Sequence, residues 1–87
     1  MQKKELDNIK ELLINILKFQ KGHEILISEF QNRIWDMDCQ SEAYEILSIL
    51  AYDLDFYEPD ESMRKHHSEY VDKEVIKKEI INTLKQL

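Results

Sequence analysis

Hydrophobic residues of this chain recur at the spacing of amphipathic helices. In the first segment, from Lys3 to about Gln20, they follow the i, i+3, i+4, i+7 pattern that gives a helix one broad buried face. These residues are Leu6, Ile9, Leu12, Leu13, Ile16, Leu17 and Phe19. Lys18 and Lys21, with Gly22 just past them, are typical of a helix C-terminus, where cations and a left-handed glycine are favoured. We therefore expect the first helix to end just before Gly22.

The second helix is expected to be short, from about Glu29 to Met37. Ser28 and Gln31 have the three-residue spacing of a capping box at its start. The apolar side chains that share its face are Phe30, Ile34 and Trp35. Residues 23–27 stay open, since they could be extended or form a first helical turn. We expect Trp35 in the core or at its edge, because large aromatic side chains are mostly buried in small domains.

The third helix carries the most regular apolar stripe and is expected to be the central one. Ser41 is its predicted N-cap, and the helix is expected to run to about Tyr57. The stripe has 4, 3, 4, 3 spacing at Ala43, Leu47, Leu50, Leu54 and Tyr57, and Ile46 and Ile49 widen it. The opposite face, expected to point outward, holds Glu45, Ser48, Tyr52 and Asp55.

Pro59 cannot continue a helix and disfavours helical geometry at Glu58, so a loop is expected there. Residues 58–71 should form the longest connection, with room for one helical turn. Asp72 is the predicted cap of the last helix. Its predicted buried stripe is Val75, Ile76, Ile80, Leu84 and Leu87, and its Lys and Glu side chains, Glu79 included, are expected to form an ordinary solvated face.

One glycine and one proline in 87 residues indicate an all-α protein, because β and α/β folds need these residues at their turns. We predict a single domain over residues 1–87, built as a small antiparallel four-helix bundle. With 43% hydrophobic and 34% charged residues, and no apolar stretch that could span a bilayer or act as a signal peptide, the chain is expected to be soluble and cytoplasmic. A single cysteine, Cys39, fits a reducing compartment and is expected to be a small apolar filler.

The net charge of −6 comes from the middle of the sequence. Residues 34–63 hold nine Asp or Glu and no Lys or Arg, whereas the segments before and after carry a small positive balance. Five of these acids lie within residues 53–61, around Phe56, Tyr57 and Pro59. Carboxylates at the C-terminal end of a helix oppose its dipole, at a cost of about 0.3–1 kcal/mol each when exposed. That placement favours a partner of opposite charge.

Catalytic and metal chemistry are not indicated by the spacing of polar residues. His66, His67 and Glu69 are too few for a zinc site, since adjacent histidines point apart and no matching ligand is near. The acidic stretch lacks the glycine and alternate spacing of an EF-hand loop, and Pro59 interrupts it. Paired glycosidase carboxylates need a deep cleft that four short helices do not build. We expect no enzymatic activity, no catalytic residues, no metal and no cofactor.

The acidic surface leaves two interpretations. It is a solvated charge run that keeps a small protein soluble, or it is a docking face for a basic protein, with aromatic side chains as desolvated anchors. The candidate partner-binding residues are Asp55, Glu58, Asp60, Glu61, Tyr52, Phe56 and Tyr57. Direct binding to nucleic acid is disfavoured by the same negative charge.

These residues also carry a family resemblance. Tyr57, Glu58, Pro59 and Asp60 at a helix end are followed by Tyr70, Asp72, Ile76, Lys77, Glu79, Ile80 and Leu84. In order and spacing, residues 41–87 resemble the colicin D immunity proteins and their relatives in contact-dependent inhibition systems, with a weaker likeness at Glu29, Phe30, Arg33 and Ile34.

The resemblance implies a four-helix bundle that binds the C-terminal tRNase domain of a toxin and covers its active site. The acids of such a protein stand in for the phosphates of the tRNA. By position, the family's contacting acids fall on Asp55 and Asp60, and Glu58 matches the motif. The expected partner is a basic nuclease toxin domain. The alternative is a small helical adaptor or regulatory subunit that binds its partner through Trp35 or an apolar groove.

Overall fold

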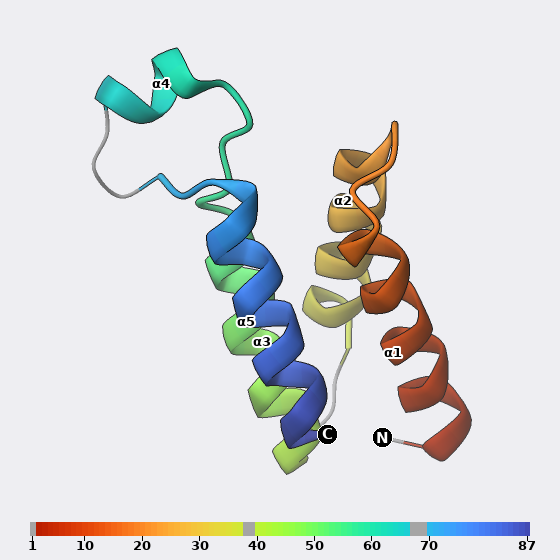
Figure 1. The fold of residues 1–87 in the computed structure, drawn as a ribbon. Coiled ribbons are helices and arrows are strands. Elements are labelled where there is room, and N and C mark those ends of the chain that lie inside the picture. The colour runs from red at the N-terminus through yellow and green to blue at the C-terminus, as the bar shows by residue number, and fades with distance from the viewer. Residues whose placement is uncertain (1, 38–39, 67–69) are drawn as a thin grey trace.

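In the computed structural model, the chain folds into an antiparallel bundle of four helices, with a short additional helix at one end (Figure 1). The structure describes residues 2–37, 40–66 and 70–87. The helices of this part are α1 (Lys3–Leu17), α2 (His23–Trp35), α3 (Glu42–Leu54), α4 (Glu61–His66) and α5 (Lys73–Gln86). Figure 1 shows α1 beside α2 and α3 beside α5, with α4 beyond the end of the α3 and α5 pair. The predicted all-α four-helix bundle is confirmed, and the expected helical turn in residues 58–71 is α4.

The hydrophobic core lies between the four long helices. Its buried apolar side chains are Ile9, Leu12, Leu13, Ile16, Ile27, Phe30, Ile34, Leu47, Leu50, Ala51, Leu54, Ile76 and Ile80. One buried polar contact joins two of the helices, because Gln31 of α2 donates a hydrogen bond from Nε2 to the carbonyl oxygen of Ala51, at 3.0 Å. α4 contributes no buried side chain. The core therefore belongs to α1, α2, α3 and α5, and α4 is an appendage.

Three predictions of buried side chains are wrong. Ile49, expected to widen the core stripe of α3, is 65% exposed, and Val75 of α5 is also exposed. Trp35, expected in the core or at its edge, is 53% exposed at the end of α2. A helix buries only the arc that its neighbours cover. Ile49 lies next to Leu50, which is 2% exposed, so the boundary of the covered arc runs between these two residues.

The start of α2 and the end of α1 also differ from expectation. α1 ends at Leu17 and α2 begins at His23, so Ser28 is an exposed residue inside α2 and not its cap. Gly22, with φ 88°, is the N-cap of α2. Phe19 takes the left-handed conformation, with φ 46°. Its ring packs on His23 and on Tyr57, with centroid separations of 4.9 and 6.0 Å, and these contacts offset the strain of the left-handed backbone.

The predicted caps of α3 and α5 are confirmed. The Ser41 hydroxyl accepts from the Tyr44 amide at 3.1 Å, and Oδ1 of Asp72 accepts from the amides of Glu74 and Val75, both at 3.1 Å. α3 ends at Leu54, three residues earlier than expected. The reason lies far along the sequence: Tyr57 leaves the helix to pair with Val71 in an isolated parallel bridge.

Candidate partner-binding surface

The structure divides the predicted acidic residues into two positions. Asp55 is the exposed C-cap residue of α3, Glu58 and Asp60 lie in the turn that leads into α4, and Glu61 is the first residue of α4. Asp55, Asp60 and Glu61 are exposed and Glu58 is half-buried. We call these four residues the acidic end. Three of its carboxylates are accessible to a partner.

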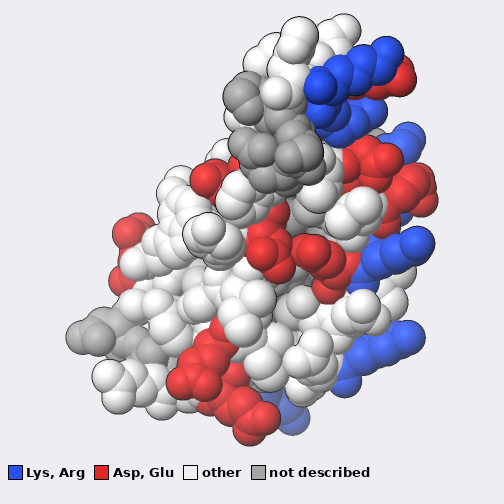
Figure 2. All heavy atoms as spheres, turned by 90° about the vertical axis from the view of Figure 1, so that its left-hand side faces the viewer, with Lys and Arg blue, Asp and Glu red and all other residues white. Residues whose placement is uncertain are grey.

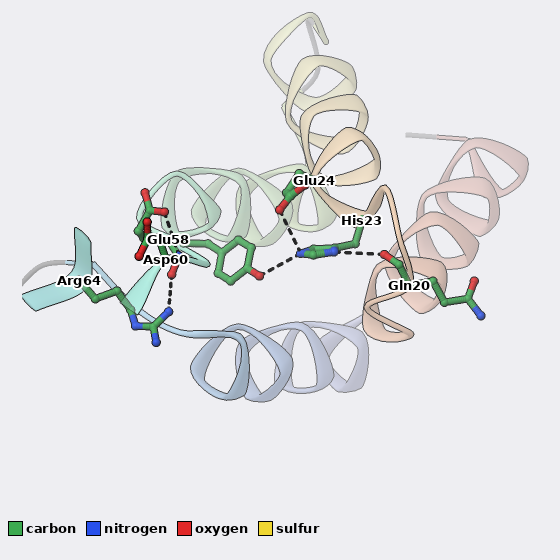
Figure 3. Close-up of polar contacts among 7 residues, drawn as sticks. Gln20, His23, Glu24, Glu58, Asp60 and Arg64 are labelled. Carbon is green, nitrogen blue, oxygen red and sulfur yellow. Dashed lines mark hydrogen bonds and ion pairs between the residues drawn. The ribbon is translucent and has the colours of Figure 1, made fainter. Parts of the chain in front are cut away.

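Glu58 and Asp60 also organise the turn itself. Oε1 of Glu58 accepts from the Asp60 amide at 3.1 Å, and Oδ1 of Asp60 accepts from the Ser62 amide at 2.9 Å, where α4 begins. Arg64 of α4 returns to the turn and donates from Nη1 to the carbonyl oxygen of Glu58, at 2.6 Å (Figure 3). The sequence showed acids without bases here, whereas the fold brings a guanidinium beside Glu58. Asp60 is therefore both a member of the acidic run and the cap of α4.

Two backbone hydrogen bonds close the base of this excursion. The Val71 amide donates to the carbonyl oxygen of Phe56 at 2.9 Å, and the Glu58 amide donates to the carbonyl oxygen of Val71 at 3.0 Å. These bonds form the bridge between Tyr57 and Val71. They hold the end of α3 against the start of α5, so that the acidic end keeps a defined position relative to the bundle.

The side chain of Tyr57 packs inward against His23, so it is not presented as a surface contact for a partner. Its hydroxyl donates to Nε2 of His23 at 2.9 Å, while Nδ1 of His23 donates to the carbonyl oxygen of Gln20 at 3.2 Å (Figure 3). Burial, with the Glu24 carboxylate as a second cause, raises the pKa of Tyr57, so the phenol stays neutral and keeps its proton for this bond. Of the seven predicted binding residues, Tyr57 is the one that the structure places in the packing between the α1–α2 turn and the end of α3.

Tyr52 and Phe56 form an aromatic pair on the outer side of α3. Their ring centroids are 5.4 Å apart at an interplanar angle of 67°, an edge-to-face arrangement. Tyr52 is 64% exposed and Phe56 is half-buried. Ile49, one turn before Tyr52, extends the exposed apolar side chains along the helix. We call Ile49, Tyr52 and Phe56 the α3 stripe. It adjoins the acidic end through Asp55.

A second acidic site lies between α3 and α5, and the sequence analysis missed it. Asp53 of α3 and Glu79 of α5 line an open groove of about 190 Å³, together with Ile49, Leu50, Asn82, Thr83 and Gln86. Burial first, and then the charge of Asp53 and a hydrogen bond to it, raise the pKa of Glu79. A hydrogen bond between the two carboxyl groups requires a proton on one of them. The second oxygen of Glu79, Oε2, is buried without a hydrogen-bond partner. The available signal in the sequence was that Glu79 lies one helical turn after Ile76, which was predicted to be buried.

The charges on this side of the molecule are unevenly distributed. Figure 2 views the face built by α3 and α5 and shows acidic side chains down its middle, with Lys and Arg gathered along one edge. Basic and acidic atoms also meet at the top, where α4 lies. In this view, carboxylates away from Lys and Arg therefore gather in the middle of the face.

The remaining polar groups do not assemble a metal site in the part of the chain that the structure describes. No three His, Cys, Asp or Glu side chains come together there. His66 is exposed at the end of α4, while His67, Glu69 and Cys39 lie outside the described residues. No helix within residues 2–37, 40–66 and 70–87 is long and apolar enough to cross a bilayer.

Comparison with protein families, with curated proteins and with solved structures gives no match. The surface of α3 and its neighbours is thus the basis for any function, with its acidic end, its exposed apolar stripe and its groove with two carboxyl groups. Such a surface can bind a protein of positive charge.

Proposed function

We propose that this protein is an immunity protein that binds and neutralises the basic ribonuclease domain of a bacterial toxin. The observation that carries the proposal is the meeting of exposed carboxylates with a partly exposed aromatic pair at the end of α3. Asp55, the exposed C-cap residue of α3, lies between Tyr52, which is on that helix, and Phe56, which follows it. The resemblance of residues 41–87 to the colicin D immunity proteins supports the same partner class, a tRNase.

The mode of inhibition is plugging. Carboxylates of the acidic end occupy the positions of RNA phosphates on the toxin and meet its Lys, Arg or His side chains, while the bundle blocks access of the RNA. Charges of this kind accelerate encounter with a basic partner, and the aromatic pair supplies apolar contact area at the centre. No catalytic group is needed on the inhibitor.

The stability cost of the acidic end supports a role in binding. Asp55 stands at the negative end of the α3 dipole, where a cation would be favourable. A carboxylate there lowers the stability of the free protein and becomes useful when a positive partner arrives. Selection for stability alone favours the opposite charge at this position.

The test is protection from a basic ribonuclease domain, which we expect to be encoded by the gene beside this one. Cleavage of tRNA by that purified basic domain should stop when the wild-type protein is added at equal concentration. Asp55→Lys combined with Asp60→Lys should abolish protection and weaken binding by about 100-fold or more, since truncating one partner of a desolvated charge pair costs about 2–5 kcal/mol. Full protection by this double variant would refute the proposed surface.

A second candidate function is favoured by Trp35. This side chain is 53% exposed at the end of α2, and tryptophan is enriched at the centres of protein interfaces. An adaptor that binds through Trp35 should have an affinity that barely changes between low and physiological salt. Trp35→Ala should then abolish binding, whereas the substitutions at Asp55 and Asp60 should leave it unchanged.

A further inference from the structure

The outer side of α3 is uncovered over most of its length. Ile49 and Tyr52 are 65% and 64% exposed, and Phe56 follows one turn later. Ile49 and Tyr52 lie on one side of the helix at i and i+3. Phe56, in the turn just after α3, packs on Tyr52 and extends the stripe beyond the helix end. Glu45, one turn before Ile49, is exposed and continues the same side with a carboxylate.

The edge of this stripe toward α5 is the groove that holds Asp53 and Glu79. Its volume of about 190 Å³ is more than ten times the roughly 10–15 Å³ that one water molecule needs by the same measure. The seven residues that line it carry two carboxyl groups and no base. Oε2 of Glu79 is buried and unpaired. A positive group in the groove would find two carboxylates that no described cation contacts.

We propose that the groove between α3 and α5 binds a basic amphipathic helix of a partner protein. Apolar side chains of that helix pack on Ile49 and Tyr52, and one Lys or Arg enters between Asp53 and Glu79. The proposal deepens the proposed function, since it adds a second contact region for the same basic partner beyond the acidic end. It concerns the middle of α3, whereas the proposed function concerns the end of that helix.

Charge complementarity selects the occupant. An amphipathic helix laid along two helices of a bundle presents apolar residues three and four positions apart, and the residues of the stripe are separated by the same intervals. Its flanking Lys and Arg would meet Glu45, Asp53 and Glu79. A second copy of this chain is a poor occupant, because a two-fold interface places the same patch against itself. The carboxylates of one copy would then face a patch that carries the same carboxylates, and the protein already carries a net charge of −6.

The test uses a synthetic 14-residue helical peptide of Leu and Lys, with Leu on one face, as the probe. At physiological salt, which screens unspecific attraction, titration should shift the amide resonances of Ile49, Asp53 and Glu79. Asp53→Asn combined with Glu79→Gln should weaken binding about tenfold or more, as measured by calorimetry. A peptide with Gln in place of Lys should bind about as weakly to both proteins.

The matched control is Asp7→Asn combined with Glu11→Gln. Both residues are exposed on α1, and the double substitution removes the same charge, so binding of the Lys peptide should change less than about twofold. An equal loss of affinity for the Lys peptide in both double variants would refute the groove as the binding site. Resonance shifts confined to the acidic end would refute it as well. So would self-association of the free protein through Ile49 and Tyr52 in sedimentation experiments.

The same variants separate this inference from the proposed function. If Asp53→Asn with Glu79→Gln keeps full affinity for the toxin domain while Asp55→Lys with Asp60→Lys loses it, the groove is refuted and the immunity function stands. If the toxin domain does not bind at all but the Lys peptide binds in the groove as described, the immunity function is refuted and the docking groove stands.

Discussion

The hydroxyl of Tyr57 and Nε2 of His23 are 2.9 Å apart, although the two residues are separated by 34 positions in the sequence. His23 is the first residue of α2, and Tyr57 follows the end of α3. Phe19 packs against both rings. This small aromatic cluster fixes the end of the bundle from which the acidic end projects.

Tyr57→Phe should therefore destabilise the protein by about 0.5–1.5 kcal/mol, because it removes one part-buried hydrogen bond and leaves Nε2 of His23 without its donor. Urea denaturation measures the loss. The control is Tyr52→Phe. Because the Tyr52 ring is exposed, loss of its hydroxyl should change stability by less than about 0.5 kcal/mol. An equal effect of the two substitutions would mean that the hydrogen bond between Tyr57 and His23 does not stabilise this end of the bundle.

Leu50 and Ile49 are neighbours with opposite environments, at 2% and 65% exposure. Leu50→Ala should cost about 2–5 kcal/mol, since it opens a cavity in the core. Ile49→Ala should cost less than about 1 kcal/mol, because that side chain is mostly in water already. Chemical melts of the two variants check the pair. Similar losses would mean that the covered arc of α3 is wider than the structure has it.

Glu79→Gln should make the protein more stable at neutral pH. Burial and the neighbouring Asp53 raise the pKa of Glu79 in the folded state above its ordinary value of 4.5. Below pH 4.5 the group is protonated in both the folded and unfolded states, so it costs nothing. As the pH rises from 4.5 through the raised pKa, the unfolded state loses its proton first, and the free energy of unfolding falls.

The glutamine variant lacks this titration, and its amide can donate to Asp53. Its advantage over wild type should be largest at pH 7 and should shrink toward pH 4. Urea melts at both pH values measure it. A Glu74→Gln variant, altered at an exposed position of the same helix, serves as the control and should show no such gain. An advantage of Glu79→Gln that is independent of pH would contradict the assigned cause.

Asp55→Lys should separate stability from binding. At the C-terminal end of α3 a cation is favourable, so the variant should gain about 0.3–1 kcal/mol while it loses affinity for a basic partner. Asp36, the exposed C-cap residue of α2, offers the matched control. Asp36→Lys should give a similar gain in a thermal melt and keep the affinity. A loss of affinity in both variants would indicate that only the net charge matters.

Much of the bundle could be predicted from the periodicity of apolar residues, because that pattern is local. Leu47, Leu50 and Leu54 were predicted in the core and are buried there. The caps at Ser41 and Asp72 were also predicted, since they depend on residues two or three positions away. The exposure of Ile49 could not be read in the same way, because it depends on how far α5 covers α3.

The parts that sequence reasoning missed depend on contacts between distant segments. The early end of α3 follows from the pairing of Tyr57 with Val71. The left-handed Phe19 and the start of α2 at His23 depend on Tyr57 as well. Glu79 appeared to belong to a solvated face, because nothing local reveals that Asp53 of another helix lies opposite. For the binding surface, the sequence indicated the charge and the aromatic residues but not the groove.

The bridge between Tyr57 and Val71 has an evolutionary consequence. Because Phe56 and Glu58 bond to Val71 at the foot of the excursion, and α4 adds nothing to the core, the intervening segment can change length or composition with little effect on the bundle. Doubling such a loop costs only about 0.6 kcal/mol of closure entropy. Descendants of this protein can thus acquire new recognition segments by exchange at this one position, and an engineered segment can be grafted there.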